Sequence, residues 1–254
     1  MANRVKLVVA YFGRPFHGWQ RQRGLRTVQG ELENAVATLI GGSRTPVVGA
    51  GRTDTGVHAA GQCAHVDLPA PIPSDNLVRG LNASLPPEIR VRSARPVDDR
   101  FHARTGALAK LYTYRARWRE PGLPWFELRS ARVPAVIDAT AFAAAVKLLS
   151  GRHDWASFTV PDPGPGSTVR TIYHVRLTPR RDGLDLEFVG EGFLRYQVRR
   201  MVGALLEVGR QKCNIDRLRG LIEHPEPGSR IHTAPASGLC LERVYYRRVP
   251  TFKN

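Results

Sequence analysis

The first part of the chain alternates between short apolar stretches and longer amphipathic ones. The short stretches carry β-branched and aromatic residues, and one of them alternates apolar with polar side chains, as a strand with one buried face does. The expected strands are Val5–Tyr11, Pro46–Ala50, Gln62–Leu68 and Ile89–Ala94. Glycines and prolines separate them from the segments with helical spacing.

Two helices are expected between these strands. Apolar residues recur at helical spacing from Val28 to Ile40, with Thr27 as the N-terminal cap and Gly41 as the stop. A second helix is expected over Leu77–Leu81, with Ser74 as its cap. The order strand, helix, strand, strand, helix, strand predicts a split βαβ, or ferredoxin-like, arrangement.

The second half of the chain repeats this order loosely. Its expected elements are strands over Leu108–Trp118, Trp155–Val160, Thr171–Leu177, Leu184–Val189 and Leu239–Arg247, and helices over Ala139–Leu149, capped by Asp138, and Phe193–Val208. The stretch Val160–Ser167 is rich in proline and glycine and is expected to be a loop. We therefore expect an α+β fold of two ferredoxin-like halves, residues 1–104 and 105–254.

The balance of charge indicates a polyanionic partner. Lys and Arg number 38 against 22 acidic residues, which gives a formal net charge of +16. Only five of the 38 are lysines, and the guanidinium fork of arginine binds phosphate bidentately and stacks on bases. A GC-rich genome would also raise the share of arginine, but it would not explain the net charge. RNA is the partner that this composition favours.

Cysteine and histidine spacing argues against a metal centre. The three cysteines, Cys63, Cys213 and Cys240, form no C-x-x-C pair, and the eight histidines show no zinc-binding spacing. The N-terminus leads straight into a strand-like segment rather than a signal peptide, and no apolar run is long enough to span a membrane. We expect a soluble, cytoplasmic protein without metal.

The stretch Gly51–Ala60, which reads GRTDTGVHAA, is the strongest candidate for chemistry. It places Asp54 on a tight turn directly after an apolar strand, with Arg52 two residues earlier. A carboxylate that a nearby cation keeps ionised is suited to be a nucleophile or a general base. The alternative is that Asp54 only hydrogen-bonds the amides of its own turn.

The same stretch resembles the G-R-T-D-x-G-V-H motif of the TruA-type tRNA pseudouridine synthases. Other segments are similar to this family too. They are Tyr11–Gly13 with Phe16–Gln22 (Y-D-G…G-W-Q-R-Q), Phe101–Arg104 with Tyr112–Tyr114 (F-H-A-R…Y-x-Y), Phe193–Gly203 (F-x-x-x-M-V-R-x-I-V-G) and Ala234–Leu241 (A-P-x-x-G-L-x-L). Phe12 stands where the family has Asp, Gln197 where it has Met, and Cys240 where an aromatic is common.

The resemblance implies a role for each matched residue. Asp54 is expected to be the nucleophile and Arg199 its cationic partner, while Tyr112 stacks on the target base and Leu239 closes the other face of that base. Arg52 is expected to fill the space that the flipped nucleotide leaves. From the residues alone, Trp19 could equally be a packed aromatic, and either Tyr112 or Tyr114 could line a cleft or simply pack on the sheet. Leu239 could be an ordinary strand residue, and Arg199 a solvated arginine at the border of its helix.

The family implies isomerisation of uridines 38, 39 and 40 in the anticodon stem-loop of tRNA. It also implies a pseudouridine synthase fold with a mixed, largely antiparallel sheet and a central cleft, a homodimer, and no cofactor. Two alternatives stay open at this point. One is a tRNA-binding protein with the same fold and no catalysis, and the other is a metal-dependent nuclease built around Asp54, Asp67 and His65.

Overall fold

The structure is a computed structural model that describes residues 3–42, 44–118, 128–160 and 166–250. The chain divides into two compact units. Unit 1 consists of Met1–Leu108 together with Cys240–Val249, and unit 2 contains Ala109–Leu239. Most of the proline- and glycine-rich loop expected at Val160–Ser167, residues 161–165, lies outside the described residues.

Unit 1 contains the six elements expected from the first part of the sequence, in the expected order. They are β1 (Asn3–Tyr11), α1 (Val28–Ile40), β2 (Val47–Gly49), β3 (His58–Leu68), α2 (Ser74–Ser84) and β4 (Ile89–Pro96), and the later strand β10 (Leu239–Tyr245) joins them from Cys240 onward. The sheet has β1 between β4 and β3, with β2 on the far side of β3, and all these pairs are antiparallel. This confirms the ferredoxin-like arrangement for unit 1.

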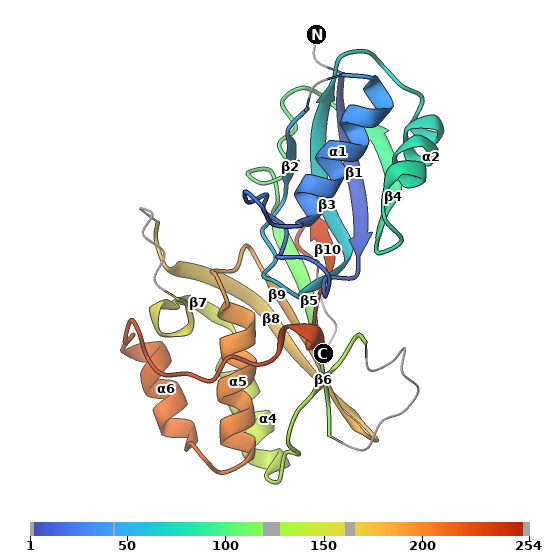
Figure 1. Ribbon diagram of the computed structural model, residues 1–254. Coiled ribbons are helices and arrows are strands. Elements are labelled where there is room, and N and C mark those ends of the chain that lie inside the picture. Colours follow the sequence, from blue (N-terminus) through green and yellow to red (C-terminus); the bar gives the residue numbers. More distant parts are fainter. Residues whose placement is uncertain (1–2, 43, 119–127, 161–165, 251–254) are drawn as a thin grey trace. The chain divides into compact units, whose positions relative to one another are not determined.

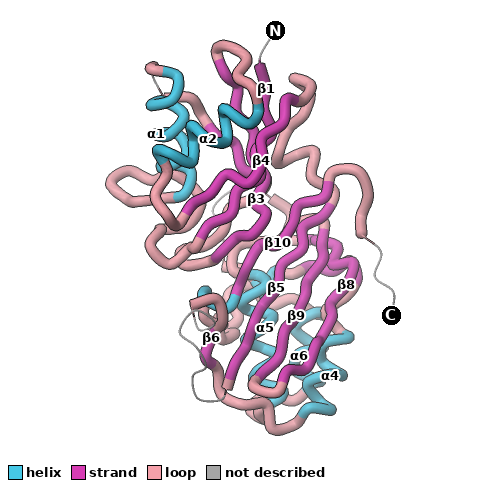
Figure 2. The backbone as a smooth tube through the Cα atoms, turned by 90° about the vertical axis from the view of Figure 1, so that its right-hand side faces the viewer, coloured by secondary structure: helices cyan, strands magenta, loops and turns pink. Residues whose placement is uncertain are grey.

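Two helices cover one face of this sheet, as Figures 1 and 2 show for α1 and α2. Helix α1 has the predicted bounds because both of its ends carry strong signals. The hydroxyl of Thr27 accepts a hydrogen bond from Gly30 N, and Gly41 adopts the left-handed conformation with φ 61°. The cap predicted for α2 was wrong: Pro73 precedes the helix, Ser74 is its first residue, and no side chain caps it.

Unit 2 begins with β5, and its described residues form three α-helices. Its elements are β5 (Ala109–Arg117), β6 (Ala131–Arg132), α4 (Ala139–Lys147), β7 (Gly151–Asp154), the 3-10 turn η1 (Ala156–Phe158), β8 (Val169–Arg180), β9 (Gly183–Gly190), α5 (Gln197–Gly209), α6 (Ile215–Glu223) and η2 (Ala236–Gly238). Strands β5, β9, β8 and β7 pair antiparallel in that order, and β6 pairs parallel to β5. Helices α4, α5 and α6 lie together behind these strands in Figure 2.

Three features of unit 2 differ from the sequence prediction. The strand predicted at Trp155–Val160 was wrong, because the indole of Trp155 is buried and donates to Arg170 O at 2.9 Å while the next residues form η1. Helix α5 starts at Gln197 rather than at Phe193, because Tyr196 has a left-handed φ of 61° that ends the preceding loop. The short elements α6 and β6 were not predicted.

Among the described residues, no helix is both long enough and apolar enough to cross a membrane.

The predicted cap of α4 is confirmed, since the carboxylate of Asp138 accepts from Ala141 N at 2.8 Å. A tight turn at Arg181 and Asp182 joins Arg180 of β8 to Gly183 of β9.

Candidate active site

Asp54 lies in a tight turn between β2 and β3 of unit 1. Its carbonyl oxygen accepts a hydrogen bond from Val57 N at 3.1 Å, and Gly56 has a φ of 80° at the third position of that turn. A positive φ there is the mark of a type II turn, which favours glycine. The side chain of Asp54 is half-buried, so the turn presents the carboxylate at the surface of unit 1 without leaving it fully in water.

A buried polar network holds the residues just before Asp54. The hydroxyl of Tyr11 on β1 lies 2.8 Å from the hydroxyl of Thr53. The amide nitrogen of Gln62 on β3 donates to Gly51 O at 2.9 Å and reaches the Tyr11 hydroxyl at 3.4 Å. Burial raises the pKa of Tyr11, so its hydroxyl stays protonated and can donate. Side chains of β1 and β3 thus hold the backbone of the Asp54 loop in place.

The segment after β1 supports the same loop from the side. A side chain at Gly13 would place its Cβ 2.0 Å from Val57 O, and one at Gly18, which has a φ of 81°, would lie 2.6 Å from Thr53 O. Trp19 N donates to Thr53 O at 3.0 Å. These close approaches leave no room for a side chain at Gly13 or Gly18, so both glycines allow the segment to pack against the Asp54 loop.

Two aromatic residues of this segment are packing residues. Trp19 is 2% exposed, so of the two interpretations that the sequence left open, packing holds. Phe12, which stands where the family has Asp, lies against the imidazole of His58 with ring centroids 4.8 Å apart. His58 in turn accepts a hydrogen bond from Gly13 N at 3.1 Å through Nδ1. At position 12, an apolar ring thus stands where the family has a carboxylate, and this ring packs on His58, the last residue of the G-R-T-D-x-G-V-H motif.

Arg52 is exposed, whereas Thr53 beside it is buried. Its Nε donates to the side-chain oxygen of Gln20 at 3.0 Å. An exposed guanidinium two residues from Asp54 suits a contact with RNA.

Tyr112 and Tyr114 project from β5 of unit 2, and both rings are buried. Tyr112 meets the ring of Phe193 edge-on, with centroids 5.3 Å apart and an interplanar angle of 86°. Tyr114 donates its hydroxyl to Pro235 O at 3.1 Å, and burial raises its pKa. Tyr112 is 6% exposed, so this packing fixes the orientation of its ring.

Arg199 lies in the first turn of α5, where two hydrogen bonds clamp it to the segment before η2. Its Nε donates to Ala234 O at 2.8 Å, and Ala234 N donates to the carbonyl of Arg199 at 3.1 Å. Its guanidinium also lies 5.1 Å from the ring centroid of Tyr196. One turn later in α5, a Cβ at Gly203 would lie 1.8 Å from His232 O, so only glycine allows this approach.

Leu239 follows η2 directly and is 5% exposed. Its amide bonds to Ala236 O, and a Cβ at the preceding Gly238 would lie 2.7 Å from the ring of Tyr114. The segment from Ala234 to Leu239 therefore contacts α5 at one end and β5 at the other, and it brings three of the matched motifs of unit 2 together.

The predicted site residues fall in both units. Asp54 and Arg52 belong to unit 1, whereas Tyr112, Arg199 and Leu239 belong to unit 2. The pairing of Asp54 with Arg199 stays a prediction. Sequence reasoning missed Tyr11, Gln62 and Gln20, although a glutamine inside the apolar run of β3 was a signal for a buried polar contact.

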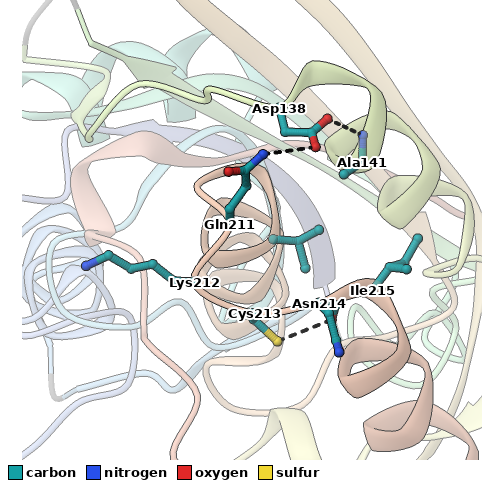
Figure 3. Close-up of a pocket in the computed structure, with 8 residues that line it drawn as sticks. Asp138, Ala141, Gln211, Lys212, Cys213, Asn214 and Ile215 are labelled. Carbon is teal, nitrogen blue, oxygen red and sulfur yellow. Dashed lines mark hydrogen bonds between the residues drawn. The ribbon is translucent and has the colours of Figure 1, made fainter.

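A separate pocket of about 330 Å³ lies among the helices of unit 2 (Figure 3). Asp138 at the start of α4 and Gln211, Lys212 and Cys213 after α5 line it, and Gln211 reaches Asp138 at 3.5 Å. It contains none of the predicted site residues. The part of the chain that the structure describes holds no cluster of three His, Cys, Asp or Glu residues placed to bind a metal ion.

Comparison with known proteins gives one consistent result. Residues 7–105 and 145–247 match the family described as tRNA pseudouridine synthase. A protein of Maridesulfovibrio salexigens called tRNA pseudouridine synthase A is 40% identical over 247 residues, which are 96% of this chain and 90% of that protein. The protein of the same name from Bacillus subtilis is 40% identical over 245 residues, which are 96% of this chain and 99% of that protein.

Proposed function

Because the chain belongs to the tRNA pseudouridine synthase family, we propose that it isomerises uridines 38, 39 and 40 of the tRNA anticodon stem-loop to pseudouridine. The observation that carries this proposal is the match over nearly the whole chain, together with the rigid turn that presents Asp54. The choice of the anticodon stem-loop rests on the resemblance of the motifs to the TruA type.

The reaction exchanges one bond between ribose and base for another. The C1′–N1 glycosidic bond breaks, the uracil turns, and C1′ joins C5, after which C5 loses its proton and N1 carries one. Asp54 would act as the nucleophile, either on ribose C1′ or on the uracil ring. The exchange is redox-neutral and releases no group, so these residues need no cofactor to balance it.

The other site residues would prepare the base and the carboxylate. Arg199 would keep Asp54 ionised, because a cation nearby lowers the pKa of a carboxyl group. The clamp on Ala234 limits the rotamers that Arg199 can adopt, which suits such a role. Tyr112 would stack on the target base and help to remove the C5 proton, and Leu239 would cover the other face of the base.

Arg52 would fill the stack from which the nucleotide is flipped. Its exposure and its place in the motif support this role. In this proposal residues 1–104 carry the catalytic loop and residues 105–254 complete the cleft. The resemblance further leads us to propose a homodimer that acts on tRNA in the cytoplasm.

The two other functions have less support. In the metal-dependent nuclease, Asp67 and His65 would bind metal, but Asp67 pairs with Arg4 at 2.7 Å and Nδ1 of His65 accepts from Ala103 N at 3.1 Å. A tRNA-binding protein without catalysis has no use for a carboxylate among phosphates, where like charges repel.

The test is to map pseudouridine in unmodified tRNA after incubation with the protein and a chelator. We expect modification at positions 38 to 40 with the wild-type protein, and none with Asp54→Asn, whose tRNA affinity should stay within about threefold because binding is spread over many arginines. Asp67→Asn, in the same unit, is the control and should stay active. Two outcomes would contradict the proposal: a wild-type protein that loses activity when the chelator is added, or an Asp54→Asn variant that stays active.

A further inference from the structure

The exposed side chain of Arg52 is held from behind by a chain of hydrogen bonds. Its Nε donates to Gln20 Oε1 at 3.0 Å. Gln20 Nε2 donates to Gln29 Oε1 at 2.8 Å, and Gln29 Nε2 donates to Glu33 Oε1 at 2.9 Å. We refer to Gln20, Gln29 and Glu33 as the glutamine relay.

The direction of each amide in the relay is fixed by its neighbours. The backbone N–H of Arg21 meets Gln29 at 2.9 Å and can only donate, so the atom that it meets must be Oε1. Gln29 Nε2 then faces two acceptors, Glu33 Oε1 and Val47 O. In the same way, Nε–H of Arg52 can only donate, so the atom of Gln20 that it meets must be Oε1. Every donor in the relay therefore points toward Glu33.

The relay ends on a buried charge. Glu33 is 1% exposed, whereas Gln29 and Gln20 are half-buried and Arg52 is exposed. Arg21 at 3.2 Å and Arg44 at 3.5 Å compensate one carboxylate oxygen of Glu33, and Val47 N donates to the other at 3.1 Å. A charge at the end of a chain of donors polarises each bond in it, which stiffens the whole chain.

We propose that Gln20, Gln29 and Glu33 are positioning residues for Arg52. The relay holds Nε and leaves the two terminal nitrogens of Arg52, for which the described residues supply no hydrogen bond, to meet the RNA. An arginine that is already oriented loses less rotamer freedom when it enters the space that the flipped nucleotide leaves, so the relay favours the flipping step rather than the first binding of tRNA. This inference rests on the proposed function, because it needs Arg52 to act on the flipped nucleotide.

Gln20→Met tests the relay at its contact with Arg52, because it keeps the volume and removes the acceptor. We expect its single-turnover rate of pseudouridine formation to fall roughly five- to tenfold, with tRNA affinity nearly unchanged. The reason is that a misplaced Arg52 slows the reaction of the bound tRNA more than it weakens binding. Gln22→Met is the matched control in the same segment. Among the described residues, the side chain of Gln22 is bonded to His17 O alone, at 3.2 Å, so this variant should keep the wild-type rate.

A double-mutant cycle with Arg52→Ala separates positioning from a general effect on folding. If Gln20 acts through Arg52, Gln20→Met should have no further effect once Arg52 is alanine. Gln29→Met, which does not contact Arg52, should show the same dependence with a smaller loss. The inference is overturned if Gln20→Met stays within about twofold of the wild-type rate, or if its effect is equally large in the Arg52→Ala background.

The cycle also distinguishes this inference from the proposed function. A wild-type protein that forms no pseudouridine overturns the proposed function and the inference with it. An active wild-type protein whose Arg52→Ala variant keeps the full rate overturns the inference alone.

Discussion

Tyr11 shows how a single buried hydroxyl can matter to a reaction that it does not touch. It links Thr53, the neighbour of Asp54, to Gln62 on the central strand β3. Tyr11→Phe would leave two buried polar groups with fewer partners, which costs about 1–3 kcal/mol of folding free energy. We expect the rate constant for isomerisation to fall about tenfold or more, because the loop loses its support.

Tyr246→Phe is the control for this prediction. The hydroxyl of Tyr246 donates to the backbone oxygen of Ala103 in unit 1 at 2.7 Å, and it lies outside the network below the loop. Thermal unfolding should show both variants destabilised, while a pseudouridine assay should show a loss of rate for Tyr11→Phe only. Equal rates for the two variants would assign Tyr11 to stability alone.

At the residue scale the sequence predicted the groups on the loop but not those beneath it. Asp54 and Arg52 stand in a contiguous motif, so a pattern could find them. Tyr11 reaches Gln62 only after β1 and β3 have paired, which places Val9 opposite Gln62. Strand register decides which residues of distant segments come into contact, and no local sequence pattern predicts such a contact.

The elements with strong end signals were predicted best. Helix α1 has a threonine cap and a glycine stop, and its bounds match the prediction. The apolar run that starts at Trp155 has no such signals, and a short apolar run does not distinguish a strand from a buried turn. The start of α5 was misplaced because the left-handed φ of Tyr196 is a rare conformation for a residue other than glycine.

Helix α5 can be tested through its closest approach to the rest of unit 2. Gly203→Ala would force a Cβ against His232 O, which should cost about 1–3 kcal/mol of folding free energy and shift the segment that clamps Arg199. Activity should therefore fall more than the loss of folded protein explains. Chemical denaturation and single-turnover rates on the same samples check this.

Gly220→Ala on α6 is the matched control. Nothing lies within 4 Å of the Cβ that it would add. Alanine favours a helix over glycine by about 0.5–1 kcal/mol, so this variant should be as stable as the wild type or more so, with unchanged activity. Destabilisation of both variants to the same extent would show that the approach at Gly203 is not special.

For the whole molecule, the net charge of +16 leads to a prediction about binding. Each phosphate contact makes the slope of log affinity against log salt concentration more negative by about 0.7–0.9. Several contacts should therefore weaken tRNA binding on the order of a hundredfold between low and physiological salt. Two tRNAs with unrelated stem sequences should respond alike, because A-form RNA offers shape, phosphate and 2′-OH rather than base edges. Fluorescence titrations of both tRNAs across a salt series measure this. A flat response, or a strong preference for one stem, would contradict it.

Strand β10 gives the molecule a particular order of assembly during synthesis. Its residues Cys240 and Leu241 pair with His58 and Ala59, directly after the Asp54 turn, and Tyr245 O accepts from Leu108 N at 2.8 Å. A ribosome makes these residues only after Ala109–Leu239, the main segment of unit 2, at roughly 5–20 residues per second. The nascent chain must therefore hold the Asp54 turn beside an open sheet edge for several seconds, a state that chaperones are suited to protect.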